Sequence, residues 1–98
     1  MSLGDPLSSG SQVEHVVANG AVVALCAGPC ILRRVVIGKK GVGNTLDVMG
    51  TGGGATILLI DTASSIGTLE CNIALPLLSY QLSGGTAADL IIVYDVNP

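Results

Sequence analysis

The stretch Thr68-Leu69-Glu70-Cys71-Asn72-Ile73-Ala74-Leu75 indicates the fold class more directly than any other part of the chain. From Leu69 onward every second side chain is apolar, whereas Glu70 and Asn72 fall on the opposite face. Successive side chains of a β-strand point to opposite faces, so this alternation is typical of a strand with one buried face. The stretch therefore predicts a half-buried strand.

Seven further stretches predict strands, because runs rich in Val, Ile and Thr lie between clusters of Gly, Asn and Pro. The eight predicted strands are residues 12–17, 21–27, 31–38, 45–49, 55–61, 68–75, 77–83 and 89–95. Turn residues occupy 27–29, 39–44, 50–54 and 83–86, and Asn19-Gly20 predicts a two-residue hairpin. A spacing of about 8–12 residues from strand to strand is typical of a sandwich or barrel.

Helical periodicity free of Gly and Pro is absent from the sequence. We therefore expect an all-β fold, an antiparallel two-sheet sandwich that is jelly-roll-like and has about eight strands. A chain of 98 residues suffices for one small domain. Residues 13–98 are predicted to form that domain and residues 1–12 a flexible polar arm, whose Met-Ser-Leu start is typical of a cloning remnant.

The composition is unusually aliphatic. Hydrophobic residues make up 49% of the chain, yet Phe and Trp are missing and Tyr80 and Tyr94 are the only tyrosines. Charged residues are 11%, less than half the usual share of about 25%, which excludes a disordered chain. The net charge of −3 does not suit a nucleic-acid-binding protein. The mean hydropathy is +0.70, but Gly, Pro and Asn interrupt the long uncharged stretches, so we expect no membrane span and no signal peptide.

Three predicted strands are apolar on both faces instead of alternating. Because the outer face of an antiparallel sandwich normally contacts water, we predict that these outer faces meet another subunit of a homo-oligomer. The candidate interface residues are Ala21, Val22, Val23, Leu25, Ile57, Leu58, Leu59, Ile60, Leu90, Ile91, Ile92 and Val93. The alternative is that these strands lie under loops of the same chain.

The three cysteines leave several possibilities open. Cys26 and Cys30 flank the turn at 27–29, so we expect them to end adjacent strands within reach of a disulfide. With Cys71 and His15 they make a formal Cys3His set for zinc, although the spacing is unlike that of zinc knuckles. Reduced, buried thiols are the third possibility, and the odd count favours a reducing compartment. We predict no metal site and no cofactor.

Leu59-Ile60-Asp61-Thr62-Ala63-Ser64-Ser65 resembles the Asp-Thr-Gly loop of retroviral-type aspartic proteases, in which two carboxylates from two chains share a proton. Ala63 stands where that family mostly has Gly, and the chain after Asp61 is too short for the rest of that fold. The alternative is that Asp61 ends a strand and accepts the N–H of Ala63 or Ser64.

The glycines at 50–54 resemble a phosphate cradle, but a predicted strand follows them instead of a helix, so we expect a plain connection.

The four basic residues lie close together in the sequence. Arg33, Arg34, Lys39 and Lys40 fall within eight positions, whereas the seven acidic residues are spread along the chain. We predict a docking patch for an acidic surface, such as that of a neighbouring subunit. The alternative is a solvated strand end and turn. The charge and the aromatic content are both too low for nucleic-acid binding.

Three segments resemble small structural proteins encoded by tailed bacteriophages. They are 28–37 (GPCILRRVVI), the pair 45–48 (TLDV) and 54–57 (GATI), and 83–95 (SGGTAADLIIVYD). Together they span most of residues 13–95. The resemblance implies a virion or prophage component, such as a head-decoration, fibre or tail accessory protein, with a trimeric assembly and no catalytic residues.

We therefore expect a non-enzymatic structural or assembly protein that acts through oligomeric packing of β-sandwiches. Its expected partners are copies of itself, with a trimer favoured, and other virion proteins, but neither nucleic acid nor a membrane. The expected location is the virion, or the host cytoplasm during assembly. An alternative is a β module that binds a small ligand or carbohydrate, and a third interpretation is an enzyme similar to an aspartic protease.

Overall fold

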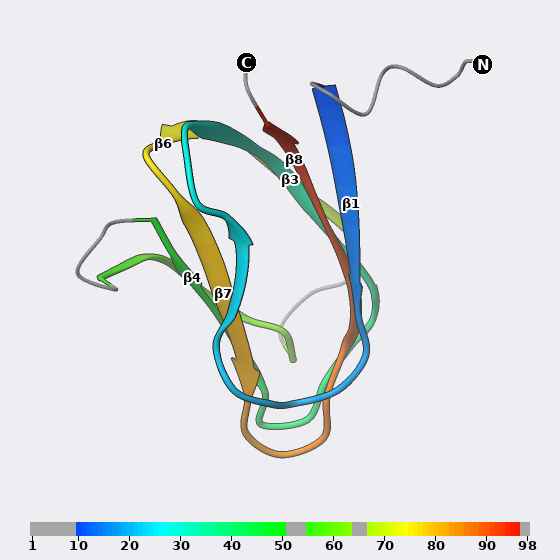
Figure 1. Cartoon of the computed structure of the whole chain (residues 1–98). Coiled ribbons are helices and arrows are strands. Elements are labelled where there is room, and N and C mark those ends of the chain that lie inside the picture. Colours follow the sequence, from blue (N-terminus) through cyan, green and yellow to red (C-terminus); the bar gives the residue numbers. More distant parts are fainter. Residues whose placement is uncertain (1–9, 51–54, 64–66, 97–98) are drawn as a thin grey trace.

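The computed structural model describes residues 10–50, 55–63 and 67–96 of the chain. The regular elements in these ranges are all β-strands, packed as two layers (Figure 1). They are β1 (Gly10–Val16), β2 (Val23–Cys26), β3 (Cys30–Lys39), β4 (Thr45–Met49), β5 (Thr56–Asp61), β6 (Gly67–Leu75), β7 (Leu78–Ser83) and β8 (Asp89–Val96). Each predicted strand is present, and its ends lie within two residues of the predicted bounds.

The strands form two four-stranded antiparallel sheets. One has the order β1-β8-β3-β6 and the other β2-β7-β4-β5, and we name them the β1 sheet and the β2 sheet. The predicted all-β antiparallel two-sheet sandwich of eight strands is therefore confirmed. The alternation that predicted β6 is also present, because Leu75 is buried and Ile73 half-buried while Ala74 and Asn72 are exposed.

Two sequence predictions about the chain path are wrong. The first concerns the arm at 1–12: Gly10 already pairs with Val96 in the β1–β8 ladder, so residues 10–12 belong to the sandwich. Residues 1–9 lie outside the described part of the chain. The second is the Asn19-Gly20 hairpin, which cannot exist because β1 and β2 belong to different sheets.

Most of the remaining connections also join strands of different sheets. The segments at 27–29, 39–44 and 83–86 each cross from one sheet to the other, because β2 and β3, β3 and β4, and β7 and β8 lie in different sheets. Of consecutive strands, β4 and β5 pair with each other, and the connection through 50–54 joins them as a hairpin. Residues 51–54 of that connection lie outside the described ranges. Turn residues therefore marked where strands end, but not which strands pair.

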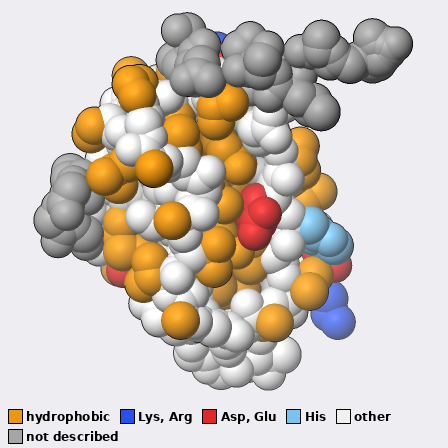
Figure 2. Space-filling model, in the orientation of Figure 1, with side chains coloured by type: hydrophobic (Ala, Val, Ile, Leu, Met, Phe, Trp, Pro, Cys, Tyr) orange, Lys and Arg blue, Asp and Glu red, His pale blue; other side chains and the backbone are white. Residues whose placement is uncertain are grey.

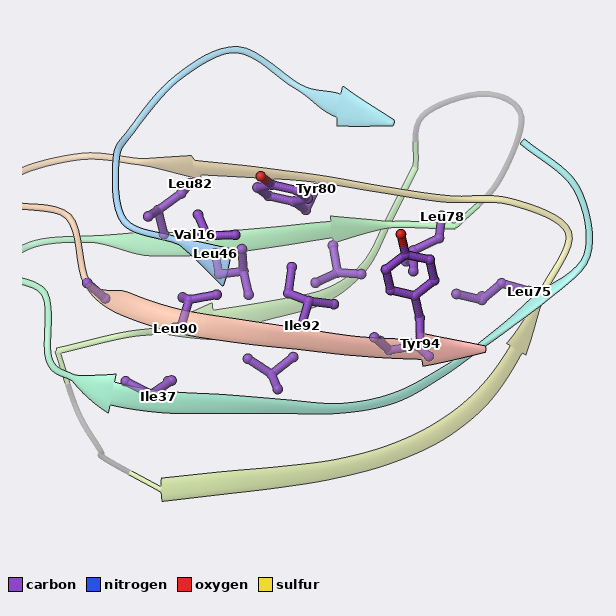
Figure 3. Packing of buried hydrophobic residues seen from close by; sticks show 14 of the residues in the cluster. Val16, Ile37, Leu46, Leu75, Leu78, Tyr80, Leu82, Leu90, Ile92 and Tyr94 are labelled. Atoms are coloured by element: carbon purple, nitrogen blue, oxygen red, sulfur yellow. The ribbon is translucent and has the colours of Figure 1, made fainter. Parts of the chain in front are cut away.

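The core fills the space between the two sheets (Figure 3). Leu46, Leu78 and Leu82 of the β2 sheet are fully buried against a layer that contains Leu90 and Ile92 of the β1 sheet. Burial of each such side chain contributes about 1.5–3 kcal/mol to the free energy of unfolding. The predicted aliphatic core is therefore confirmed, and the tyrosines Tyr80 and Tyr94 are its largest members.

A buried amide holds together the end of the sandwich where several loops cross between the sheets. Asn44 precedes β4 and its side chain is only 1% exposed. Its Nδ2 donates to Asn19 Oδ1 at 2.8 Å, to the Ser83 carbonyl at 2.9 Å and to the Gly84 carbonyl at 2.8 Å. One side chain thus joins the β1–β2, β3–β4 and β7–β8 connections, which meet at the lower end of the view in Figure 1.

The amide oxygen completes this hub. Asn44 Oδ1 accepts from Thr62 Oγ1 at 2.8 Å and from the Ala88 N–H at 3.1 Å. Close backbone approach supports the arrangement, since a Cβ on Gly85, whose φ is +45°, would collide with the Val42 carbonyl. A left-handed conformation in this space requires glycine. The buried polar groups at this end are therefore paired, as burial demands.

Replacing Asn44 by Ala is expected to lower the free energy of unfolding by about 3 kcal/mol, because several buried donors and acceptors lose their partner at once. Chemical denaturation monitored by circular dichroism measures this change. The matched control is Gln81→Ala, which removes a more exposed amide that donates to the Gly20 carbonyl at 3.2 Å. It should cost less than about 1 kcal/mol. Equal losses in the two variants would contradict the special role of Asn44.

Candidate functional site

The lateral edges of the two sheets are the most distinctive surface of this sandwich. An edge strand exposes a row of unpaired backbone N–H and C=O groups that another chain can pair with. Each of the four edge strands also carries a large aliphatic side chain that is substantially exposed. These are Val13 of β1 (63%), Leu69 of β6 (42%), Val23 of β2 (37%) and Leu59 of β5 (64%). Among the described residues, the central strands carry none.

The β1 edge is protected by an inward-pointing charge. Glu14 lies opposite the buried Ile92 in the β1–β8 ladder, so its side chain points between the sheets. There its Oε2 accepts a hydrogen bond from Tyr80 Oη of β7 at 3.1 Å. An added strand would further desolvate this carboxylate, and inward-pointing charges are one way in which proteins keep edges from pairing. Glu14 was not among the predicted site residues. The sequence signal that could have found it is its position two residues before Val16, because residues two apart in a strand lie on the same face.

The β6 edge is protected by charge and by an irregular backbone. Glu70 is exposed and its Oε2 accepts from Arg34 Nε at 3.0 Å. Asn72 has a φ of +52°, and the β3–β6 register shifts between Leu32 and Arg34. Such a bulge bends a strand and interrupts its regular pairing edge. Both edges of the β1 sheet are therefore unsuited to simple strand addition.

The edges of the β2 sheet lack this charge, although their ladders also shift register, between Ala24 and Cys26 and between Val48 and Met49. β2 has the sequence VALC with no charged residue, and β5 has the sequence TILLID with Asp61 at its last position. Among the described residues, the ion pairs Arg33–Asp95 and Arg34–Glu70 lie in the β1 sheet, and so does the hydrogen bond between His15 and Asp89. The two edges of the β2 sheet, which we name the apolar edges, are the strands β2 and β5. They form the candidate functional site.

The predicted interface residues divide into three groups. Ala21, Val22, Val23 and Leu59 are exposed, and Leu25, Ile57, Leu58, Ile60, Ile91 and Val93 are half-buried. Leu90 and Ile92, by contrast, are fully buried in the core of their own chain, so their assignment to an interface is wrong. Strict alternation along β8 directs these two side chains inward and leaves Ile91 and Val93 on the outer face.

Figure 2 shows hydrophobic side chains spread over the face on which both sheets are seen side by side. Charged groups are few on this face, and a histidine lies beside acidic and basic groups at its right margin. The apolar character of the sequence is therefore also a property of the surface.

The predicted docking patch is divided into two parts. Arg33 Nε donates to Asp95 Oδ2 at 2.6 Å, and Arg34 pairs with Glu70, so both arginines are engaged within the β1 sheet. Lys39 and Lys40 are exposed at the other end of β3. At about 3.3 Å per residue, some 20 Å of strand separates the two pairs. Docking through these residues stays a prediction, and Lys39 and Lys40 are the pair that remains exposed for it.

Asp61 has the turn role that one of the two interpretations expected. Its Oδ1 accepts the N–H of Ala63 at 3.0 Å, just after the end of β5. Ser64 and residues 51–54, which include three of the glycines, lie outside the described residues. The aspartic-protease interpretation gains no support from this contact, which is an ordinary Asx turn.

The cysteines and His15 do not assemble into a ligand set. Within the described ranges, no three His, Cys, Asp or Glu side chains gather where a metal ion could bind, which argues against the Cys3His alternative. Cys26, Cys30 and Cys71 are free thiols. Cys26 ends β2 and Cys30 begins β3, and these strands lie in different sheets, so the expectation that the two cysteines flank adjacent strands is wrong. Their disulfide stays a prediction.

Comparison with known proteins identifies the fold. Neither a protein-family model nor a curated protein matches the chain. A solved structure described as "Bacillus endospore appendages form a novel family of disulfide-linked pili" matches with a TM-score of 0.58 and 9% sequence identity. The match covers 89% of this chain and 82% of the other. At this identity the likeness shows a shared sandwich fold. The described part of the chain has no helix long and apolar enough to cross a membrane.

Asp95 should make the stability of the β1 sheet pH-dependent. Hydrogen bonds from Ser11 and Arg33 hold the pKa of Asp95 below its usual value. A depressed carboxyl pKa contributes stability above the unfolded value of about 3.9, and this contribution is lost as the pH falls through the folded value. The wild type should therefore exceed Asp95→Asn in unfolding free energy by the largest amount near neutral pH. This difference should shrink as the pH falls below about 4. A difference that persists unchanged in acid would contradict this.

Tyr80 should titrate late because of its position beside Glu14. Burial, followed by the hydrogen bond to Glu14, raises the pKa of Tyr80 to about 12. A raised pKa stabilises the fold below the unfolded value of about 10, and this stabilisation is lost as the pH rises toward 12. Glu14→Gln should lower the Tyr80 pKa, though not to 10, because burial remains. Tyrosinate absorbance against pH, in a Tyr94→Phe background, measures the shift, and Glu70→Gln serves as the control that should leave it unchanged.

Proposed function

We propose that this chain is a non-enzymatic structural or assembly protein that associates with copies of itself through the apolar edges. The observation that carries the proposal is the contrast between the two sheets. Register shifts occur beside edges of both sheets, so the difference lies in charge: the edges of the β1 sheet carry Glu14 and Glu70, whereas β2 and β5 carry a single acidic residue at one end. Exposed apolar edges of this kind favour pairing with another chain.

The position of the apolar edges sets the geometry of association. β2 and β5 are opposite margins of one sheet, so β2 of one copy can pair with β5 of the next. Such a contact joins two different surfaces, and it therefore generates either a closed ring or an open filament. Each junction would cover Leu59 and its neighbours on β5 and satisfy the backbone groups of both edges.

Two settings have support of different kinds. The sequence resemblance to small phage proteins supports a head-decoration, fibre or tail accessory component, with a ring of three copies and other virion proteins as partners. The fold likeness to a pilus protein supports an extended polymer. We favour the phage setting, because its resemblance extends to short sequence segments, and electron microscopy of the assembled protein distinguishes rings from filaments.

Ligand binding is the alternative function. A carbohydrate-binding module needs aromatic rings exposed for stacking on sugars. Tyr80 and Tyr94 are both buried in the core and are the only aromatic residues of the chain. This placement favours the structural function over sugar binding.

Charged substitutions on the apolar edges should weaken self-association. Burial of a leucine side chain contributes about 1.5–3 kcal/mol, which corresponds to about a tenfold to hundredfold change in dissociation constant. Leu59→Lys on β5 and Ala24→Lys on β2 should each raise the dissociation constant for self-association at least about tenfold, as measured by sedimentation. Val42→Lys is the matched control, because Val42 is equally exposed but lies in the β3–β4 loop, and it should not alter association.

Mixing the two edge variants tests the direction of pairing. Leu59→Lys retains an intact β2 edge and Ala24→Lys an intact β5 edge, so β2–β5 pairing predicts dimers in the mixture and monomers of each variant alone. Dimers of each variant alone would show that like edges pair instead. A wild-type protein that stays monomeric at micromolar concentration would overturn the proposed function.

A further inference from the structure

Cys26 and Cys30 occupy a point where the two sheets are joined by only three residues. Cys26 is the last residue of β2 at the margin of the β2 sheet, and Cys30 is the first residue of β3 inside the β1 sheet. The Cys26 thiol donates to the Gly28 carbonyl at 3.1 Å, which folds its side chain back over the loop. The two cysteines thus flank a single short connection between the sheets.

The two thiols differ in access to solvent. Cys30 is 2% exposed, whereas Cys26 is half-buried. Burial, together with a hydrogen bond to the Cys26 side chain, raises the pKa of the Cys30 thiol to about 12. A thiolate is the reactive form in disulfide exchange, so the buried sulfur is a poor first nucleophile. The accessible sulfur of the pair is Cys26.

We propose that Cys26 and Cys30 form a reactive dithiol that small-molecule disulfides such as oxidised glutathione convert into an intrachain disulfide. In the first step the Cys26 thiolate attacks one glutathione sulfur, the glutathione S–S bond breaks, and one glutathione leaves as its thiolate. In the second step Cys30 loses its proton to solvent and attacks the Cys26 sulfur, and the second glutathione leaves. The protein dithiol is oxidised by two electrons and the glutathione disulfide is reduced to two thiols.

The disulfide would act on the shortest strand of the sandwich. β2 has four residues, pairs only with β7, and has a register shift between Ala24 and Cys26. A covalent bond from Cys26 to Cys30 would tie this edge strand to β3 in the opposite sheet. Oxidation would therefore reduce the opening of β2 independently of whether the apolar edges associate.

Mass spectrometry of the intact, folded chain tests the order of reaction. All variants carry Cys71→Ser, because Cys71 on β6 is a third free thiol. With oxidised glutathione, the chain that keeps Cys26 and Cys30 should lose the mass of two hydrogens and retain no glutathione. Cys30→Ala should accumulate a stable adduct of one glutathione at Cys26. Cys26→Ser should react more slowly than Cys30→Ala, by roughly tenfold or more, because its remaining thiol is buried.

Hydrogen exchange of the β2 amides provides a second readout on unmutated Cys26 and Cys30. Exchange should slow after oxidation and return to the original rate after reduction. The proposal is overturned if both thiols stay free, if Cys26→Ser reacts as fast as Cys30→Ala, or if non-reducing gels show that the disulfide links two chains. None of these outcomes bears on the apolar edges, whose test is the oligomeric state.

Discussion

The buried amide of Asn44 is the interaction on which the architecture depends. Because nearly all consecutive strands lie in different sheets, the chain must cross the end of the sandwich repeatedly, and crossing segments have no ladder to pair their backbone groups. Asn44 supplies donors for the Ser83 and Gly84 carbonyls and an acceptor for the Ala88 N–H. With these groups paired, the leucine core can close without unpaired polar atoms at that end.

Scarce charge is the second constraint, and its distribution explains the candidate site. Only 11% of the residues are charged, and within the described ranges the ion pairs Arg33–Asp95 and Arg34–Glu70 both lie in the β1 sheet. Glu14 between the sheets and Glu70 on β6 protect that sheet at both margins. The edge strands of the β2 sheet expose aliphatic side chains and unpaired backbone groups with almost no charge to protect them. We therefore assign association to these edges and not to the outer face of the sheet.

Local patterns predicted the elements well and their pairing badly. The alternation in β6 and the β-branched runs elsewhere predicted all eight strands, because side-chain periodicity is a local property. Asn19-Gly20 shows the limit: it has hairpin composition, yet its neighbours enter different sheets and the Asn19 side chain bonds to Asn44 and to the Gly84 carbonyl instead. The strands that are apolar on both faces predicted interface residues, but Leu90 and Ile92 belong to the core. The sequence did not indicate that β2 and β5 are edge strands.

The sequence by itself determined the class of the fold, its strand boundaries to within two residues and its aliphatic core, since each depends on residue types and their order along the chain. It left the role of Asp61 open between a turn and a catalytic carboxylate. Only the tertiary structure decided which strands became edges, where Glu14 points and which cysteine is buried. These properties depend on contacts between residues far apart in sequence, such as Glu14 with Tyr80 and Asn44 with Ser83, which no local periodicity encodes.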